Sequence, residues 1–277
     1  MMELRGKAVA DAYKARLQKD IEALAREGVQ LKLAILLVGD NHGARMYASF
    51  MEKTAIGAGL ACQVHSLPVE ASQEEVEACL VSLNQDPQVH GILPLMPMPD
   101  HIDTERLIDL LDPKKDIDGL TTYNIGLVTA GKGGLAPCTA KACMAILDHY
   151  QIPLAGKHVV VVGRSQVIGK PVALMALAAN ATVTICHSKT QDLADQVRQA
   201  DIIIAAAGRA HMITGDMVKP GAVVIDVGIN ELDGKTVGDV DYDAASQVAG
   251  AITPVPGGVG SVTTTMMLAA VYEAYHA

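Results

Sequence analysis

Apolar segments with two different periods alternate along the chain. Continuous apolar runs are typical of strands buried on both faces, whereas apolar residues three or four positions apart are typical of amphipathic helices. The first half predicts helices over residues 6–27, 44–58, 72–84 and 104–111, and strands over 31–39, 62–68 and 89–95. The second half predicts helices over 138–150, from 169 onward and over 262–275, and strands from 158 and over 181–187, 200–208, 221–229 and 250–253. Residues 112–124 and 230–241 are expected to be loops, and the alternation of strands and helices predicts an α/β fold.

The stretch from His158 to Ser188 has the pattern of a mononucleotide-binding βαβ unit. A run of four valines ends in Gly163, a polar turn follows, and Gly169 and Pro171 open an Ala/Leu-rich helix. A second strand follows at the spacing that a βαβ unit allows, so a phosphate is expected at the helix N-terminus. The glycines are spaced G-x-x-x-x-x-G and not G-x-G-x-x-G, so an ordinary βαβ crossover without a ligand stays open as the alternative.

The end of the second strand favours a cofactor with a 2′-phosphate. NAD sites usually carry Asp or Glu at this point, where the carboxylate accepts hydrogen bonds from the ribose. Here the strand ends in His187, Ser188 and Lys189, and Arg164 in the first loop is a further donor. We therefore expect NADP, although His187 and Lys189 taken separately are typical of a solvated turn.

Composition restricts the class of protein. The 277 residues are enough for two domains, and half of them are apolar, with Phe50 as the only Phe and no Trp, so the core is expected to be aliphatic and rich in Met. The net charge of −9 argues against nucleic acid or an anionic membrane as a partner. Five scattered cysteines without C-x-x-C predict reduced, structural thiols in a cytoplasmic protein. The sequence predicts no metal site, signal peptide or transmembrane segment.

Several stretches together indicate a family. They are VGDNHGARMY (38–47), KDIDGLTTYNIG (115–126), APCT (136–139), VVGRSQVIGKPVAL (161–174), ATVTICHSKT (181–190), VIDVGIN (224–230) and ITPVPGGVGSVT (252–263). In these stretches, which are spread over nearly the whole chain, the sequence resembles the methylenetetrahydrofolate dehydrogenase/methenyltetrahydrofolate cyclohydrolase family, the FolD-type bifunctional enzymes.

The resemblance implies two α/β domains with a cleft between them, the second a Rossmann-like doubly wound parallel sheet. It implies a folate-binding, catalytic domain formed by residues 1–137 plus 261–277, and an NADP-binding domain formed by residues 138–260. The expected substrates are tetrahydrofolate derivatives, the expected cofactor is NADP, and a homodimer is expected.

Individual residues match the family's site positions. Tyr47 matches the tyrosine that stacks on the substrate, and Asp118 matches the carboxylate that binds the pterin ring. Cofactor-contacting positions are matched by Gly163, Arg164, Ser165, Ser188 and Ile229, to which the strand pattern adds Gly169 and His187; the folate-side wall is matched by Pro256, Gly257 and Gly258. Simpler interpretations stay open: Tyr47 as a core residue, Asp118 as a turn residue before Gly119, and residues 254–260 as a hinge. The nearby Asp116 favours a ligand role for Asp118, because two loop carboxylates are unusual for turn formation alone.

Two positions depart from the family. The family lysine four residues after the tyrosine is Met51 here, and a family glutamine in the stretch GILPLMPMP is Leu95. In the family, this lysine and this glutamine partner each other. Losing only one of them would leave the other buried and unsatisfied, at a cost of about 1–3 kcal/mol, whereas losing both can be nearly neutral. Lys53 lies about 200° around a helix from Met51, and His42 and His65 are replacements without further support.

The two half-reactions depend on the missing lysine differently. Hydride transfer from the methylene carbon of the folate to the nicotinamide mainly needs alignment. Cyclohydrolysis needs proton transfers at a positioned group, which Met51 and Leu95 cannot supply. The hypothesis is that NADP-linked dehydrogenase activity survives and cyclohydrolase activity is lost or much reduced. The alternatives are a full bifunctional enzyme with a substitute group, a non-catalytic folate- or dinucleotide-binding paralogue, and an enzyme of the shikimate-dehydrogenase type.

Overall fold

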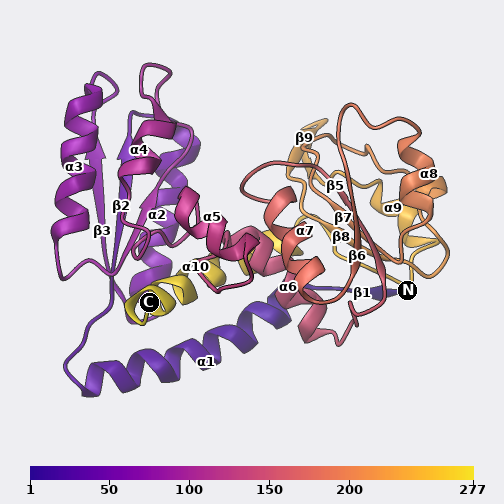
Figure 1. Ribbon diagram of the computed structural model, residues 1–277, viewed down its shortest axis with the longest axis horizontal. Coiled ribbons are helices and arrows are strands. Elements are labelled where there is room, and N and C mark those ends of the chain that lie inside the picture. Colours follow the sequence, from indigo (N-terminus) through magenta and orange to yellow (C-terminus); the bar gives the residue numbers. More distant parts are fainter. The chain divides into compact units, whose positions relative to one another are not determined.

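The computed structural model describes residues 1–277, which form two compact units (Figure 1). One unit holds a sheet of six strands and consists of Met1–Ala12, Val128–Gly131 and Pro137–Met266. The other holds a sheet of three strands and consists of Tyr13–Leu127, Lys132–Ala136 and Met267–Ala277. They are called the six-stranded and the three-stranded unit below. Helices α1 (Gly6–Arg26) and α10 (Val259–Tyr275) contribute residues to both.

The three-stranded unit contains a parallel sheet in the order β3-β2-β4. Its strands are β2 (Lys32–Val38), β3 (Ala61–Leu67) and β4 (Gly91–Pro94), and its helices include α2 (His42–Gly57), α3 (Gln73–Gln85) and α4 (Thr104–Leu110). These elements confirm the alternation predicted from the sequence. The capping box between Ser72 and Glu75 explains where α3 begins, since each side chain accepts the other residue's backbone N–H.

One predicted loop is partly helical. Residues 122–124 were expected to end a loop, but α5 (Thr122–Thr129) begins there. The physical reason is a cap: the Thr121 hydroxyl accepts the backbone N–H of Asn124 at 3.3 Å.

The sheet of the three-stranded unit is covered on both faces. Ala34, Leu36 and Val38 of β2 belong to an apolar cluster with Val76 and Leu80 of α3. The alternation of side chains along a strand directs the intervening residues of β2 to the opposite face. Helix α2 packs against β2 and β3, and its buried side chains lie outside the cluster under α3, so α2 covers that opposite face.

The six-stranded unit confirms the predicted doubly wound parallel sheet. Its strand order is β1-β11-β8-β7-β5-β6, and all its pairings are parallel. The strands are β1 (Met2–Glu3), β5 (His158–Val162), β6 (Thr182–Cys186), β7 (Ile202–Ala205), β8 (Val223–Asp226) and β11 (Ala251–Ile252). The pairing of β1 with β11 is not visible in the sequence, because two residues are too few for a periodic pattern.

Helices lie on both faces of this sheet. Val160 and Val162 point into a cluster with Val197 of α8 and Ala245 of α9, whereas Val172 of α7 is buried outside that cluster. The helices are α6 (Cys138–His149), α7 (Gly169–Ala178), α8 (Leu193–Arg198) and α9 (Tyr242–Ser246), with a short 3₁₀ helix at Gly215–Met217. None of the helices in the chain combines the length and the apolar content needed to span a bilayer.

The loop expected at residues 230–241 contains a hairpin. Strands β9 (Asn230–Leu232) and β10 (Lys235–Val237) pair antiparallel around Asp233 and Gly234. Both turn residues have positive φ values, 52° and 73°, as the tight turn of a two-residue hairpin requires. The Asp-Gly pair is the sequence signal that predicts this hairpin.

Candidate functional site

The carboxyl ends of β5 and β7 form the topological switch point of the six-stranded sheet. Within the set β5–β8 the strands lie side by side in the order β6-β5-β7-β8. Doubly wound sheets of this order bind ligands beside the two strands that correspond to β5 and β7. Gly163 follows β5 with a φ of 134°, and a Cβ there would overlap the carbonyl oxygen of Ala206, which follows β7. Only glycine therefore lets the two loops approach this closely.

The loop after β5 turns directly into α7. The Ser165 hydroxyl accepts the backbone N–H groups of Ile168 at 3.2 Å and Gly169 at 3.3 Å. A Cβ at Gly169 would overlap the carbonyl oxygen of Gly163, so this turn also requires glycine. Arg164 and Ser165 are exposed beside the N-terminus of α7, where the helix dipole favours an anion.

The turn after β6 is ordered by its own hydrogen bonds. The His187 N–H donates to the Thr190 hydroxyl at 2.8 Å, and His187 Nδ1 accepts the Lys189 N–H at 3.1 Å. His187 is half-buried and Ser188 is exposed. The backbone ladder between β5 and β6 continues into the loops that follow them, so the predicted donors Arg164, His187 and Ser188 lie on adjoining loops.

Ile229 follows β8 at the same edge of the sheet and is 71% exposed. Its neighbours in the chain are held by buried carboxylates. The Gly228 N–H donates to Asp226 Oδ1 at 2.9 Å, and Asn230 Nδ2 donates to Asp239 Oδ1 at 2.9 Å. The predicted cofactor residues thus all lie in loops at the carboxyl ends of β5, β6 and β8 or at the start of α7.

Tyr47 and Met51 lie one turn apart on α2. The helix begins at a cap in which Asn41 Oδ1 accepts the Ala44 N–H at 3.0 Å. Tyr47 is half-buried, and its hydroxyl donates to the sulfur of Met267 in α10 at 3.2 Å. Met51 is 0% exposed and forms part of the core.

Leu95 lies on the face of the three-stranded sheet that α2 covers. Its N–H donates to the Leu36 carbonyl at 2.9 Å, which continues the ladder beyond β4. Because Ile92 points into the cluster under α3, the alternation of side chains places Leu93 and Leu95 on the other face. Leu95 is 5% exposed, so both positions that were predicted to depart from the family pattern hold buried apolar side chains.

None of the three candidate substitutes lies with Met51 in the core under α2. His42 and Lys53 are exposed. His65 is paired in register with Leu36, so its side chain points to the face of α3. Its Nε2 atom is buried without a hydrogen-bond partner, and burial lowers the pKa of this imidazole.

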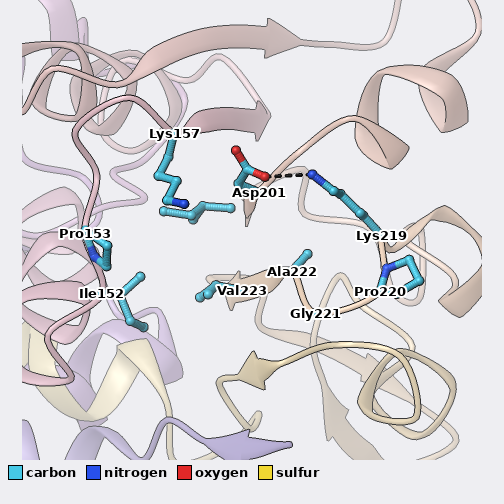
Figure 2. Close-up of a pocket in the computed structure, with 10 residues that line it drawn as sticks. Ile152, Pro153, Lys157, Asp201, Lys219, Pro220, Gly221, Ala222 and Val223 are labelled. Atoms are coloured by element: carbon cyan, nitrogen blue, oxygen red, sulfur yellow. Dashed lines mark hydrogen bonds and ion pairs between the residues drawn. The ribbon is translucent and has the colours of Figure 1, made fainter.

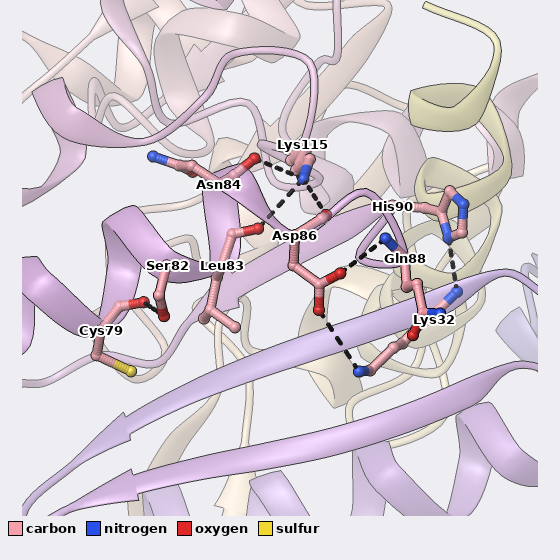
Figure 3. A network of polar contacts seen from close by, with 9 residues as sticks. All are labelled: Lys32, Cys79, Ser82, Leu83, Asn84, Asp86, Gln88, His90 and Lys115. Atoms are coloured by element: carbon pink, nitrogen blue, oxygen red, sulfur yellow. Dashed lines mark hydrogen bonds and ion pairs between the residues drawn. The ribbon is translucent and has the colours of Figure 1, made fainter.

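Lys115 anchors the start of the loop that contains Asp118. Its Nζ donates to the carbonyl oxygens of Leu83, Asn84 and Asp86, at 3.2, 2.7 and 2.7 Å (Figure 3). These carbonyls lie at the C-terminal end of α3, where a cation is favourable. Burial lowers the pKa of Lys115, and nearby carboxylates oppose that shift.

Asp116 is fully buried, and its carboxylate is hydrogen-bonded to residues that follow it closely in the chain. Its carboxylate accepts the Leu120 N–H at 2.9 Å, the Thr121 N–H and hydroxyl at 2.8 Å each, and Asn124 Nδ2 at 2.9 Å. The presence of Asp116 is therefore explained by turn formation and does not independently support a ligand role for Asp118.

Asp118 occupies a constrained place in this loop. It is half-buried and lies between Ile117, which is 0% exposed, and Gly119, whose φ is 61°. A Cβ at Gly91 would press against the Ile117 side chain, so the loop is seated closely on β4. The buried anchors on either side of Asp118 hold its backbone in place.

The predicted folate-side wall belongs to the six-stranded unit. Pro256 and Gly257 are exposed, and Gly258 is buried. The Gly257 carbonyl accepts the Gly6 N–H at 2.9 Å, and a Cβ at Gly6 would overlap the Gly258 carbonyl oxygen. The loop is thus fixed against the start of α1. Tyr47, Met51, Leu95 and Asp118 belong to the three-stranded unit.

A pocket of about 230 Å³ lies at the opposite, amino edge of the six-stranded sheet (Figure 2). Its carboxylate, Asp201, accepts Lys219 Nζ at 2.7 Å and the His158 N–H at 3.0 Å. The hydrogen bond from Lys219 lowers the pKa of Asp201. The carboxylate of Asp201 is thus already engaged within the protein, and no ligand is assigned to this pocket.

The cysteines form no disulfide. Burial raises the pKa of Cys62 to about 11 and that of Cys143 to about 12, so both thiols are protonated near neutral pH. Protonated thiols are poor nucleophiles, which fits a structural role. No cluster of His, Cys, Asp or Glu has an arrangement that would hold a metal ion.

Two structural carboxylates were not singled out from the sequence: Asp226 and Asp239. Each is buried and accepts backbone N–H groups of loops. The available signal is the nearby glycines, since a Cβ at Gly228 or Gly238 would overlap one of these carboxylates.

The fold and these loops define an α/β protein that has a dinucleotide-binding sheet and a second parallel α/β unit. Residues 4–118 match the family model described as the catalytic domain of tetrahydrofolate dehydrogenase/cyclohydrolase, and residues 137–277 match that of its NAD(P)-binding domain. The chain belongs to the tetrahydrofolate dehydrogenase/cyclohydrolase family.

Similar proteins span the full length of the chain. The bifunctional protein FolD of Pelobacter propionicus is 49% identical over 264 residues, which are 95% of this chain and 93% of that protein. The crystal structure of the bifunctional enzyme FolD from Campylobacter jejuni has a TM-score of 0.98 and 41% identity, covering 100% of this chain and 99% of that one. The Trypanosoma brucei dehydrogenase-cyclohydrolase, complexed with NADP cofactor and inhibitor, has a TM-score of 0.93 and 35% identity, covering 100% and 97%.

Proposed function

We propose that this protein is an NADP-dependent 5,10-methylenetetrahydrofolate dehydrogenase of one-carbon folate metabolism, with methenyltetrahydrofolate cyclohydrolase activity lost or much reduced. Membership of the family and an NADP-complexed relative support the first part. The observation that carries the second part is the burial of Met51, 0% exposed, and Leu95, 5% exposed, at the positions of the family lysine and glutamine.

The loops at the switch point fit a dinucleotide. The close approach that Gly163 allows and the N-terminus of α7 suit the pyrophosphate, and Arg164, His187 and Ser188 suit a 2′-phosphate. When bound, NADP accepts a hydride from the methylene carbon of the folate. Ile229 offers an exposed apolar contact to the cofactor.

Hydride transfer requires that the protein orient the folate, and it requires no proton acceptor. In the proposed roles, Tyr47 stacks on the substrate and Asp118 binds the pterin ring, while the loop from Pro256 to Gly258 forms a wall. Alignment of the two reacting carbons is the main requirement of hydride transfer, so these residues suffice for dehydrogenation.

Hydrolysis has a different requirement. Water must add to the cation shared by N5 and N10, and the ring must then open, which requires proton transfers at a positioned group. The thioether of Met51 and the alkyl group of Leu95 offer no exchangeable proton. Neither His42 nor Lys53 takes the place of the lysine beside Leu95, because both side chains are exposed whereas Met51 is buried, and His65 points to the other face of the sheet.

Absorbance at 340 nm tests the proposal. Mixing the protein with NADP and methylenetetrahydrofolate is expected to give a steady increase from NADPH, after which the methenyl product decays at the rate seen in buffer alone. Decay that is accelerated in proportion to protein concentration would instead support the second candidate, a full bifunctional enzyme, which the names of the relatives favour. Binding of both ligands without a change at 340 nm would contradict the proposal in favour of a non-catalytic paralogue.

The 2′-phosphate assignment predicts the effect of removing Arg164. Charge-assisted hydrogen bonds contribute about 1.5–3 kcal/mol, so Arg164→Ala is expected to raise the KM for NADP by roughly 10- to 100-fold. The KM for NAD should change little. Arg198→Ala is the matched control, since it removes the same charge from an exposed ion pair with Asp195 in the same unit. Equal losses with NADP and NAD would contradict the assignment.

The remaining assignments extend this proposal. Residues 1–137 plus 261–277 are proposed to bind folate, and residues 138–260 are proposed to bind NADP. A homodimer is the proposed state in solution, and light scattering on the purified chain at several concentrations measures it directly.

A further inference from the structure

Two carboxylates in the six-stranded unit are buried without a cation as hydrogen-bond partner. Asp226, the last residue of β8, is 3% exposed, and Asp239 is 0% exposed. Their partners are backbone N–H groups and one side-chain amide. Since burying a carboxylate is costly, several well-made hydrogen bonds must compensate for it.

Asp239 holds the loop that follows β7. Its carboxylate accepts the backbone N–H groups of residues 207–209 at 2.6, 2.9 and 2.8 Å. This loop begins at Ala206, whose carbonyl lies directly against Gly163. The carboxylate of Asp239 therefore fixes the position of the loop that follows β7 at the switch point.

The same carboxylate also holds the loop that follows β8. Asp239 Oδ1 accepts Asn230 Nδ2 at 2.9 Å, and Asp226 Oδ1 accepts the N–H groups of Gly228 at 2.9 Å and of Asp239 itself at 3.0 Å. Ile229 lies between the two bound residues. Asp239 thus joins both loops, and Asp226 holds Asp239 by accepting its backbone N–H.

The hydrogen bonds of Asp226 and Asp239 do more than stabilise the hydrophobic core around them. The loop that it fixes presents Ile229 to solvent, 71% exposed, so the hydrogen bonds do not serve to bury that side chain. Burial raises the pKa of Asp226 to about 6, while three backbone N–H groups oppose the shift and the charge of Asp239 adds to it. The geometry therefore keeps a costly pair of like charges at the edge where a dinucleotide is expected.

We propose that Asp239, supported by Asp226, is a positioning residue for the dinucleotide: it holds the loops after β7 and β8 in the conformation that receives the cofactor. This inference rests on the proposed function, because it assigns the cofactor to this edge. Asp239 itself is covered by the loops and acts through them.

Asp239→Asn tests the inference. The variant keeps the shape of the side chain but replaces one acceptor oxygen by an NH₂ group, which would face backbone N–H donors. NADPH binding, titrated by fluorescence without folate, is expected to weaken about tenfold or more. The KM for methylenetetrahydrofolate, and kcat at saturating NADP, should stay within about threefold of the parent.

Two further variants keep the test decisive. Asn230→Ala removes one hydrogen bond and leaves those to residues 207–209, so it should fold and weaken NADPH binding by about three- to tenfold. Asp201→Asn is the matched control, because Asp201 is a hydrogen-bonded carboxylate at the opposite edge of the same sheet. It should lower the melting temperature without changing NADPH affinity.

The outcomes separate this inference from the proposed function. Parent-like NADPH affinity in Asp239→Asn and Asn230→Ala would overturn the positioning role. An equal loss of affinity in Asp201→Asn would also overturn it, by reducing the effect to general destabilisation. A parent protein that binds no NADPH at all would overturn the proposed function itself.

Discussion

The double variant Met51→Lys/Leu95→Gln is expected to hydrolyse methenyltetrahydrofolate about 10²- to 10⁴-fold faster than the parent chain, the range that general acid–base catalysis contributes. The two substitutions place an amine and its amide partner on the face of the sheet that α2 covers. The decay of the methenyl compound, corrected for the rate in buffer, measures the gain. Dehydrogenase activity should persist, because neither position binds the cofactor in the proposed assignment.

The single variants show whether the two positions are coupled. Met51→Lys alone places an unpaired ammonium at a site that is 0% exposed, and it is expected to lower the free energy of unfolding by about 3–5 kcal/mol. Leu95→Gln alone leaves an unsatisfied amide and is expected to cost about 1–3 kcal/mol. The double variant should be more stable than the sum of these losses predicts.

Phe50→Lys is the matched control for the added charge. Phe50 adjoins Met51 in α2 but is 53% exposed, so a lysine there is solvated. It should neither raise hydrolysis nor lower stability appreciably. Rapid hydrolysis by the parent chain that the double variant fails to increase would contradict the proposed role of Met51 and Leu95.

Gly163→Ala is expected to abolish measurable NADP binding, with a loss of affinity of about 100-fold or more. The added methyl group would overlap the carbonyl oxygen of Ala206, and the φ of 134° is unfavourable for any residue with a Cβ. The loops after β5 and β7 must then separate at the switch point. Titration with NADPH measures the affinity, and chemical denaturation measures the accompanying loss of stability.

Gly156→Ala separates the conformational cost from the steric one. Gly156 also has a positive φ, 73°, but no atom lies within 4 Å of the position that its Cβ would occupy. This variant is expected to lose only about 1 kcal/mol and to bind NADPH as the parent does. If both glycine variants bind NADPH equally well, the switch point is not the dinucleotide site.

Much of the fold was predictable because it depends on local patterns. The apolar runs of β2 and β5 and the stripe of α1 are set by residues close together in the chain, and they identified the alternation of strands and helices. The hairpin around Asp233 and Gly234 carried a local signal too, although it was expected to be a loop. Strand β1 carried no such signal, because its partner β11 is remote in the sequence and both strands have only two residues.

For the candidate site, too, some features follow from the sequence and others only from the tertiary structure. The sequence by itself determined which side chains are present: an intact loop from Gly163 to Gly169, no carboxylate directly at the end of β6, and apolar residues at Met51 and Leu95. Only the tertiary structure decided that Met51 and Leu95 are buried on the face that α2 covers, and that His65 points to the other face.

The buried carboxylates show the physical reason. Asp116 lies two residues before the predicted Asp118, yet its carboxylate accepts hydrogen bonds from Leu120, Thr121 and Asn124, which follow it closely in the chain. Asp239 joins residues 207–209 to Asn230, segments that meet only when β7 and β8 pair in the sheet. Local periodicity records which face of an element is apolar, and so it determined the layers of this protein. The partner of a buried charge is selected by the loops that folding brings together, and only the tertiary structure decided that.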